Sequence, residues 1–384
     1  MSTLRAQAAL SAYTTLGLGG PAGRLIDADS AEQIVSVVRE ADESAEPVLV
    51  LGGGSNLVVA DEGFPGTVVR VTSQGIAVDA VRGDGSAVTV TVAAGESWDR
   101  LVEWSVHEGL AGLECLSGIP GLVGATPIQN VGAYGQDVSE TITEVRVYDR
   151  QRGEVATLAG AECEFGYRTS MLKRAAAGTA TGRFVVLGVS FRLRRSARSL
   201  SARSLSARAG SEPALSGPVR YQELAGRLDV ALGERVPLAQ ARSAVLALRR
   251  GKGMVLDPAD PDTRSAGSFF TNPVLTAAQF AELGRRAAGR CGPETQETRV
   301  PHFDAGAGTV KVPAAWLIER AGFGKGYPAG GAARISSKHT LALTSRDGSK
   351  TADLLALARE IAAGVRAAFG VDLTNEPVLV GVRL

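Results

Sequence analysis

One apolar segment constrains this chain more than any other feature: Ile119 to Gly135, which is rich in glycine and proline. A solvated linker is polar, whereas a long irregular segment inside a compact domain is commonly functional. Glycine and proline leave little side-chain bulk and restrict the backbone. We expect an extended backbone that lies flat against a planar ligand, with the amides of Gln129 and Asn130 at the ligand's edge. The alternative is a purely structural loop.

A second glycine-rich loop, Gly52-Gly-Gly-Ser-Asn56, follows a run that reads as a buried strand, Pro47 to Leu51. Successive backbone N–H groups in such a loop form an anion-binding concavity, and glycine lets a ligand approach them closely. Ser55 can add a side-chain hydrogen bond, as can Asn56. The spacing is not GxGxxG, and the chain has no GxxxxGK[ST] motif, so a Rossmann or P-loop nucleotide site is not supported. The alternative is a tight turn.

The charge and cysteine content exclude several classes of protein. Lys and Arg number 41 and Asp and Glu number 40, a net charge of +1 that argues against a nucleic-acid binder. Only six of the basic residues are lysine, so an individual lysine such as Lys252 is worth following. Cys115, Cys163 and Cys291 are too far apart in the chain to suggest a disulfide framework or a metal pair. A reduced, cytoplasmic protein is the simplest interpretation.

The length of 384 residues suggests two to three domains of about 150 residues each. No apolar run reaches the roughly 18 residues of a membrane span, and residues 1–15 lack the apolar core of a signal peptide. Hydrophobic periodicity predicts the following helices and β-rich runs. The helices are 30–41, 98–108, 238–249, 276–288, 314–321 and 351–369, and the β-rich runs are 47–51, 57–59, 66–71, 87–93, 143–148 and 183–193.

A Ser/Arg-rich repeat marks the clearest seam in the chain. Ser196-Ala-Arg-Ser-Leu200 recurs as Ser201 to Leu205 and nearly again as Ser206 to Gly210, with no core pattern. We interpret it as a flexible insertion between lobes. Its arginines could contact RNA or acidic lipid, but a solvated loop is favoured.

Three short motifs each contain one side chain of chemical interest. Arg168 follows an aromatic in Phe165 to Ser170, Ser268 follows a glycine in Ser265 to Pro273, and Glu376 precedes Pro377. Guanidinium groups bind carboxylate or phosphate in bidentate fashion. Alone, each has a simpler explanation: a surface arginine, a loop cap and an exposed turn acid. There is no GxSxG elbow, and the three histidines show neither triad nor metal spacing.

Together, and in this order, these motifs resemble those of the UDP-N-acetylenolpyruvoylglucosamine reductase (UDP-N-acetylmuramate dehydrogenase) family. The resemblance runs from about Thr14 to Gly381, and the Ile119 to Gly135 string is its most specific part. It implies an α+β fold. A two-lobed FAD-binding domain of the vanillyl-alcohol-oxidase (PCMH) type would cover 1–194, split near residue 70. A linker would cover 195–216, and a C-terminal α/β substrate-binding domain 217–384.

The resemblance also implies the reaction and its cofactors. Members of this family bind FAD non-covalently, take hydride from NADPH and reduce UDP-N-acetylglucosamine enolpyruvate to UDP-N-acetylmuramate, a cytoplasmic precursor of peptidoglycan in cell-wall biogenesis. We therefore expect a monomer that binds neither nucleic acid nor membrane. The preference for NADPH over NADH rests on the family alone. The residues implied in FAD binding are Gly52, Gly53, Gly54, Ser55, Asn56, Ile119, Pro120, Gly121, Gly124, Ala125, Ile128, Asn130, Gly132, Tyr134 and Val185.

The family's chemistry gives roles to three otherwise weak candidates. Arg168 would stabilise the negative charge that develops toward the substrate carboxylate, Ser268 would protonate the carbanion, and Glu376 would assist in a protonated state or through water. Substrate binding would fall to Tyr221, Arg249, Lys252 and Asn272. For Tyr221, which resembles the family's substrate-covering tyrosine, an aromatic at a helix start is an equally good interpretation.

The sequence departs from the family pattern in two places. Many members have Lys-Leu-Pro-Asp-Pro where this chain has Lys252-Gly-Met-Val-Leu-Asp-Pro258, and Thr271 stands where lysine is common. Two other functions stay open at this point. One is an oxidase of the same fold, which oxygen alone would reoxidise, and the other is a sensor that binds flavin or UDP-sugar without turnover.

Overall fold

The structure, a computed structural model, describes residues 4–79, 85–176, 180–195, 213–291 and 299–384. The chain divides into two compact units. Unit 1 comprises residues 1–8, 22–53 and 65–255, and unit 2 comprises residues 9–21, 54–64 and 256–384. The Ser/Arg repeat interpreted as a flexible insertion lies outside the described residues.

Unit 1 begins with a four-stranded sheet in the order β1-β2-β5-β3. Strands β1 and β2 pair antiparallel, whereas β3 and β5 pair parallel. Helix α1 connects β2 to β3, and residues 52–63 connect β3 to β5. Ser30 caps α1 by accepting a hydrogen bond from the N–H of Gln33, as its position before the apolar periodicity predicts. The elements are β1 (Leu4–Ala6), β2 (Ala22–Ala28), α1 (Ala31–Glu43), β3 (Val48–Leu51) and β5 (Phe64–Val71).

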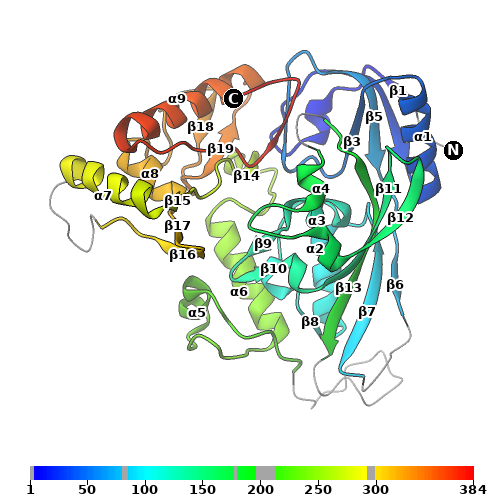
Figure 1. Cartoon of the computed structure of the whole chain (residues 1–384), viewed down its shortest axis with the longest axis horizontal. Helices are drawn as coiled ribbons and strands as arrows, with labels where there is room; N and C mark the ends of the chain where they lie inside the picture. Colours follow the sequence, from blue (N-terminus) through cyan, green and yellow to red (C-terminus); the bar gives the residue numbers. More distant parts are fainter. Residues whose placement is uncertain (1–3, 80–84, 177–179, 196–212, 292–298) are drawn as a thin grey trace. The chain divides into compact units, whose positions relative to one another are not determined.

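The second sheet of unit 1 has the order β12-β11-β13-β7-β6, with β8 also paired to β13 (Figure 1). Its strands pair antiparallel, and its apolar face forms one core with α1 and with the helix over residues 98–107. Its strands are β6 (Ile76–Val78), β7 (Ala87–Ala93), β8 (Leu110–Ala111), β11 (Ile142–Asp149), β12 (Glu154–Ala159) and β13 (Phe184–Arg195). A short hairpin, β9 (Gly132–Ala133) with β10 (Gln136–Asp137), stands apart from it.

The other α-helices of unit 1 are α2 (Trp98–His107), α3 (Thr126–Gln129), α4 (Met171–Arg174), α5 (Gln222–Leu228) and α6 (Leu238–Gly251). The position of α5 and α6 corrects the predicted C-terminal domain of 217–384. Val219, Leu224 and Val245 are buried in a cluster with Cys115, so this stretch packs within unit 1. The boundary between the compact units therefore lies between Val255 and Leu256 and not at residue 217.

The described part of unit 2 combines three small sheets with three α-helices. One sheet has the order β14-β19-β18, another β15-β17-β16, and β4 pairs parallel with β20. The longest helix, α9, buries its apolar face against the other elements of this unit. The elements are β4 (Leu57–Val59), β14 (Ser265–Ser268), β15 (Val274–Thr276), α7 (Ala277–Cys291), β16 (Phe303–Gly306), β17 (Thr309–Lys311), α8 (Ala314–Arg320), β18 (Ala333–Ile335), β19 (Ala342–Ser345), α9 (Thr351–Phe369) and β20 (Val378–Val380).

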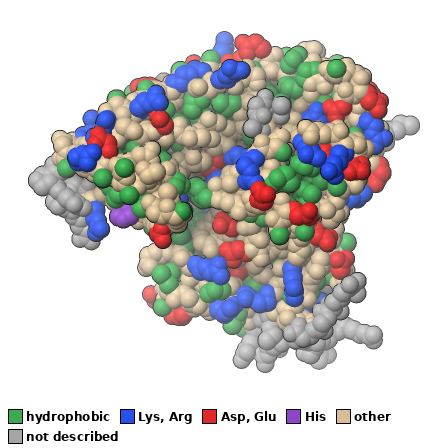
Figure 2. Space-filling view, viewed as in Figure 1, with side chains coloured by type: hydrophobic (Ala, Val, Ile, Leu, Met, Phe, Trp, Pro, Cys, Tyr) green, Lys and Arg blue, Asp and Glu red, His purple; other side chains and the backbone are tan. Residues whose placement is uncertain are grey.

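Surface charge and helix lengths agree with the composition. Basic and acidic side chains are interspersed on the face drawn in Figure 2, as a net charge of +1 suggests. Among the described residues, no helix is long and apolar enough to cross a membrane.

Candidate functional site

Two glycine-rich loops meet in unit 1 with no side chain between their backbones. A Cβ added at Gly53 would lie 2.8 Å from the Cα of Gly121, which is closer than real Cβ atoms approach backbone. A Cβ at Gly52 would lie 3.7 Å from the side chain of Leu122. Bare backbone on both sides is what a cradle for a large planar cofactor and its phosphates requires. The start of the loop Gly52 to Asn56 therefore lies against the start of the segment Ile119 to Gly135.

The segment from Ile119 to Gly135 is not extended throughout, so that expectation is wrong for its middle. Residues Val123–Ala125 form a 3-10 turn that leads into α3. Pro127 fits in the first turn of α3, where its missing N–H has no intrahelical partner to lose. Gly124 serves close packing, because a Cβ there would lie 2.7 Å from the Cβ of Ala94.

The other predicted cofactor residues lie along this segment and on the main sheet. Ile119, Pro120 and Ile128 are half-buried, and Ala125 is exposed. Val185 is buried in β13, where it pairs with Tyr148 in the core of unit 1. A Cβ at Gly132 would lie 1.7 Å from a carboxylate oxygen of Asp137, so a larger residue there would require the Asp137 side chain to move.

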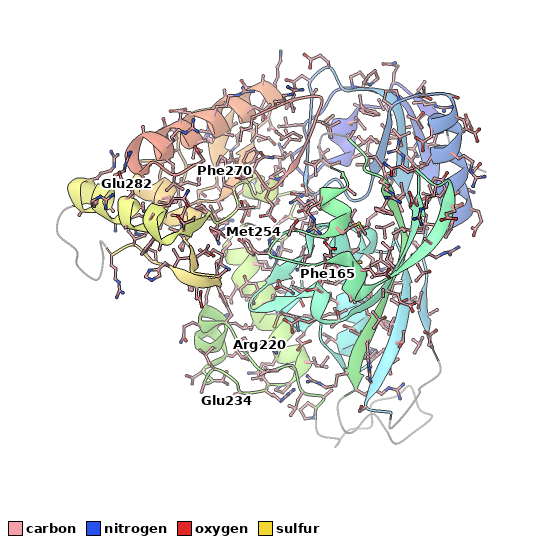
Figure 3. All side chains as sticks on the ribbon, viewed as in Figure 1. Phe165, Arg220, Glu234, Met254, Phe270 and Glu282 are labelled. Carbon is pink, nitrogen blue, oxygen red and sulfur yellow. The ribbon has the colours of Figure 1, made fainter. Side chains whose placement is uncertain are left out.

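Arg168 lies against the same segment in a strained conformation. Its φ of +52° falls in the left-handed region that a bulky side chain rarely adopts. Its guanidinium donates to the Gly132 carbonyl at 2.6 Å and to the Asn130 carbonyl at 3.4 Å. The Asn130 side chain donates in turn to the Gly166 carbonyl at 2.9 Å. Phe165, at the start of this motif, is labelled in Figure 3.

Lys173 completes this cluster, and sequence reasoning missed it. Its Nζ donates to the carbonyl of Arg168 at 3.0 Å and to Oε1 of Gln129 at 2.8 Å. Ser170 adds a hydrogen bond from its hydroxyl to the Ile128 carbonyl at 2.8 Å. The scarcity of lysine in this chain was the one sequence signal that could have pointed to Lys173.

Two further candidates, Tyr221 and Lys252, lie around Tyr134 in unit 1. The Tyr221 ring lies edge-on to it with centroids 5.6 Å apart, and Lys252 Nζ lies 5.7 Å from the Tyr134 centroid. Tyr221 occupies the N-cap position of α5, as the helix-start interpretation proposed. Burial raises the pKa of Tyr134 to about 12, so its hydroxyl stays protonated at neutral pH. Lys252 forms an ion pair of 2.6 Å with Glu223, a residue that the sequence gave no reason to choose.

Arg249 lies near the C-terminus of α6, close to this cluster. It donates to the carbonyl of Met254, which Figure 3 labels, at 2.8 Å. Its Nε is buried and has no hydrogen-bond partner among the described residues. Burial lowers its pKa to about 10, which leaves the guanidinium charged at pH 7. A buried charge with an unused donor is the state expected of a group that binds an anion.

Unit 2 brings Ser268 and Glu376 onto adjacent strands of chain. The N–H of Glu376 donates to the carbonyl of Phe269 at 2.8 Å, and Phe270, labelled in Figure 3, forms a β-bridge with Asn375. Ser268 ends β14, and both Ser268 and Glu376 are half-buried. The two candidates were more than a hundred residues apart in the sequence, and the fold makes them neighbours.

The remaining candidates of unit 2 support the backbone around this pair. Asn56 donates from Nδ2 to the carbonyl of Glu376 at 3.4 Å, so its side chain faces the Glu376 turn. Gly54 has a φ of +60°, and a Cβ there would lie 1.9 Å from the Tyr13 carbonyl oxygen. Ser55 is half-buried between them. The side-chain oxygen of Asn272 accepts the N–H of Ala314 at the start of α8, 2.9 Å away.

The candidates thus form two groups. Unit 1 holds the glycine cradle, Arg168 and the cluster around Tyr134, while unit 2 holds Ser268, Glu376, Asn56 and Asn272. Among the described residues, no group of three or more His, Cys, Asp or Glu side chains could hold a metal ion.

Comparisons with known proteins find matches along nearly the whole chain. A family model described as "UDP-N-acetylenolpyruvoylglucosamine reductase, C-terminal domain" matches residues 258–380, and one described as "FAD binding domain" matches residues 22–159. The chain is 56% identical to a UDP-N-acetylenolpyruvoylglucosamine reductase of Thermobifida fusca, which covers 98% of this chain and 97% of the relative. A protein of the same name from Salinispora arenicola is 55% identical, with 99% and 96% covered.

A solved structure supports the fold. The UDP-N-acetylenolpyruvylglucosamine reductase of Thermus caldophilus superposes with a TM-score of 0.59 at 24% identity, covering 99% of this chain and all of that one.

Proposed function

The chain belongs to the UDP-N-acetylenolpyruvoylglucosamine reductase family, and from that premise we propose how its residues divide the reaction. It reduces UDP-N-acetylglucosamine enolpyruvate to UDP-N-acetylmuramate, a precursor of peptidoglycan, with NADPH as the hydride donor. Bound FAD supplies the relay of hydride between NADPH and the substrate. We assign the residues described above to binding the cofactor and the substrate, orienting the substrate and protonating it.

The glycine cradle would hold the cofactor. Backbone N–H groups of Gly52 and Gly53 would face the diphosphate, and the Gly121 backbone would lie beside them. The predicted outcome of Gly53→Ala is loss of most bound flavin, because the new Cβ would fall 2.8 Å from Gly121 Cα. Gly284→Ala in α7 is the matched control, because a Cβ there has no heavy atom within 4 Å. Flavin absorbance per protein measures both, and full occupancy in Gly53→Ala would contradict this placement.

Arg168 would stabilise the negative charge that develops on the substrate during reduction. Hydride adds to the terminal enolpyruvyl carbon, and negative charge spreads from the adjacent carbon into the substrate carboxylate. A fixed guanidinium stabilises that charge without reorganising in the transition state. The hydrogen bonds from Arg168 to Gly132 and Asn130 carbonyls keep it in place beside the cofactor segment.

Protonation of the adjacent carbon would fall to Ser268. Its hydroxyl proton would move to the carbanion, and the serine oxygen would then take a proton back from water. The observation that carries this assignment is the hydrogen bond from Glu376 N–H to the Phe269 carbonyl, which sets Glu376 beside the Ser268 strand. A protonated Glu376, or one acting through water, would assist without repelling the intermediate.

The substrate diphosphate would bind to Lys252 and Arg249, with Tyr221 as a further donor. Arg249 supports this assignment, because its buried Nε lacks a partner among the described residues. Asn272, in unit 2, is proposed separately as a substrate-binding residue.

Rapid mixing tests the division of labour. The holoenzyme is first reduced with NADPH without oxygen and then mixed with UDP-N-acetylglucosamine enolpyruvate. For Ser268→Ala we expect near-normal reduction by NADPH and substrate-driven reoxidation slowed by about 10²-fold or more. Slow reduction with fast reoxidation would contradict the proton-donor role. Ser243→Ala, an exposed serine of α6, controls for the loss of a hydroxyl. Reoxidation by oxygen alone at a comparable rate would favour an oxidase.

We also propose a cytoplasmic monomer that acts in cell-wall synthesis, and thereby in cell shape, cell cycle and division, without binding nucleic acid or membrane. Cys115 and Cys163 support a reducing compartment, because both are buried free thiols. Burial raises the pKa of Cys115 to about 12 and that of Cys163 to about 11, so neither is a thiolate nucleophile. Light scattering that gives twice the 39.6 kDa chain mass would overturn the monomer.

A further inference from the structure

The ion pair between Glu223 and Lys252 has no place in the reaction as proposed. The Glu223 oxygen and Lys252 Nζ are 2.6 Å apart, and the two side chains are 39% and 31% exposed. Half-exposed ion pairs contribute about 1 kcal/mol or less to folding. The pair is therefore not required to hold unit 1 together, and a more highly charged anion can displace the carboxylate.

Lys252 connects Glu223 with Tyr221, the tyrosine two residues before it, by way of Tyr134. Lys252 Nζ lies over the Tyr134 ring, and the Tyr221 ring lies edge-on to Tyr134. Glu223 lies two residues after Tyr221 at the start of α5. Lys252 therefore contacts α5 through Glu223 and contacts Tyr134, the ring against which Tyr221 packs. The negative charge of Glu223 also raises the pKa of Tyr221, after the larger effect of burial.

Helix α5 does not have to move for this pair to open. Leu224, Ala225 and Leu228 are buried against Val245 of α6, which fixes the helix. Tyr221 and Glu223 lie on its exposed side, and Tyr221 is 44% exposed. Rotation of the Glu223 side chain alone would release Lys252.

We propose that Glu223 is a built-in competitor for the substrate's diphosphate: its carboxylate occupies Lys252 until a nucleoside diphosphate displaces it. The inference rests on the proposed function, which assigns Lys252 and Tyr221 to the substrate diphosphate. A displaced carboxylate that stays near the bound diphosphate repels it and weakens the complex. Glu223 thus speeds release of a diphosphate-bearing product and tunes affinity for that class of ligand.

Binding of UDP to the holoenzyme tests this directly. At low salt, Glu223→Gln should bind UDP about three- to tenfold more tightly than the wild type, because it loses both the competing pair and the repulsion. The gain should shrink at high salt, where exposed charges are screened. Glu43→Gln changes an exposed acid of α1, removes the same charge elsewhere in unit 1 and should leave affinity for UDP unchanged.

A double-mutant cycle separates this role from a general charge effect. In a Lys252→Met background, Glu223→Gln should tighten UDP binding by less than half as much as in the wild type. Unchanged flavin content and thermal unfolding temperature in Glu223→Gln would show that the fold is intact.

The outcomes are distinguishable. If the wild type binds UDP and turns over substrate but Glu223→Gln binds UDP no more tightly, the competitor role is wrong and the proposed function stands. If Glu223→Gln tightens binding equally with and without Lys252, the carboxylate does not act through that lysine, and the proposal is overturned. If the wild type neither binds UDP nor reduces the substrate, the proposed function fails and the inference with it.

Discussion

Unit 1 holds two cationic sites that are built in opposite ways. Arg168 has a left-handed backbone, donates to two carbonyls of the cofactor segment and receives a hydrogen bond on its own carbonyl from Lys173. Lys252 has one ion pair with a half-exposed carboxylate and one contact with an aromatic ring. The first site is fixed from several sides, whereas the second holds a partner that can be exchanged.

The difference matches what each cation is proposed to do. A strained backbone residue costs about 1–3 kcal/mol and persists only where its surroundings determine it. Such a fixed charge suits a transition state, which gains nothing from a group that must first reorganise. A cation with a weak partner suits a ligand that must bind and leave in every cycle.

The largest expected effect comes from breaking the fixed site. Arg168→Lys keeps the charge but cannot span the Gly132 and Asn130 carbonyls, so we expect kcat to fall about 10²- to 10³-fold with little change in KM. Steady-state kinetics measures it. Arg174→Lys, which alters an exposed pair with Glu164 in the same segment, is the control. A fall in kcat of less than tenfold would mean that Arg168 is not the group that stabilises the charge.

A change at Lys252, the cation with the exchangeable partner, should alter KM and leave kcat nearly unchanged. Lys252→Met removes a charged donor to the diphosphate, and we expect KM for the substrate to rise about ten- to thirtyfold with kcat nearly unchanged. The same kinetic assay decides. Loss of kcat at unchanged KM would place Lys252 in the chemistry and remove the contrast with Arg168.

Lys173 tests whether the fixed site depends on its support. Lys173→Met leaves the Arg168 carbonyl and Gln129 Oε1 without this donor, and we expect kcat to fall about five- to tenfold. Lys173→Arg should restore part of the rate, and Lys325→Met, an exposed lysine of unit 2, should be neutral. Destabilisation on thermal unfolding with an unchanged kcat would make Lys173 merely structural.

The smallest effect concerns the anchor of α6, which carries Lys252. Asp99 accepts two hydrogen bonds from Arg242, at 2.6 and 3.0 Å, and one from Gly118 N–H at 2.6 Å. Burial raises the pKa of Asp99, but these hydrogen bonds together outweigh it, so the pKa lies below its ordinary value of 3.8. The stabilisation is therefore present at neutral pH and is lost as pH falls through the folded pKa.

This anchor can be measured by unfolding at several pH values. Because Asp99 is partly exposed, we expect Asp99→Asn to lower the free energy of unfolding by only about 1 kcal/mol at pH 7. That difference should shrink as the pH falls below about 4 and through the lowered pKa of folded Asp99. Urea unfolding at pH 7, 5, 4 and 3 measures it, and a difference that stays constant over that range would remove Asp99 as the cause.

Local patterns predicted most of the regular elements. The helix predicted over 351–369 is α9 to the residue, and the strand predicted over 183–193 is most of β13. Both have strong periodicity and clear ends. β12 was missed because Glu154–Ala159 lies at a sheet edge and is largely exposed, so it lacks the apolar signal of a buried strand.

The candidate site was less predictable from local patterns. Resemblance named Arg168, Ser268 and Glu376, but no residue spacing could place Glu376 beside Phe269, because that contact depends on the folded unit. The hydrogen bonds from Lys173 to Gln129 and from Lys252 to Glu223 join residues far apart in the chain, so they leave no periodic pattern in the sequence. The helical turn inside Ile119 to Gly135 was missed because glycine and proline dominate the local signal there.

A single-turnover titration tests the contrast between the two cations most directly. Each NADPH-reduced holoenzyme is mixed with increasing UDP-N-acetylglucosamine enolpyruvate, and the rate of reoxidation is followed. Arg168→Lys should lower the limiting rate at saturation with an unchanged half-saturating concentration, and Lys252→Met should raise the half-saturating concentration with an unchanged limiting rate. If both variants change the same parameter, Arg168 and Lys252 do not divide chemistry from binding, and the account is wrong.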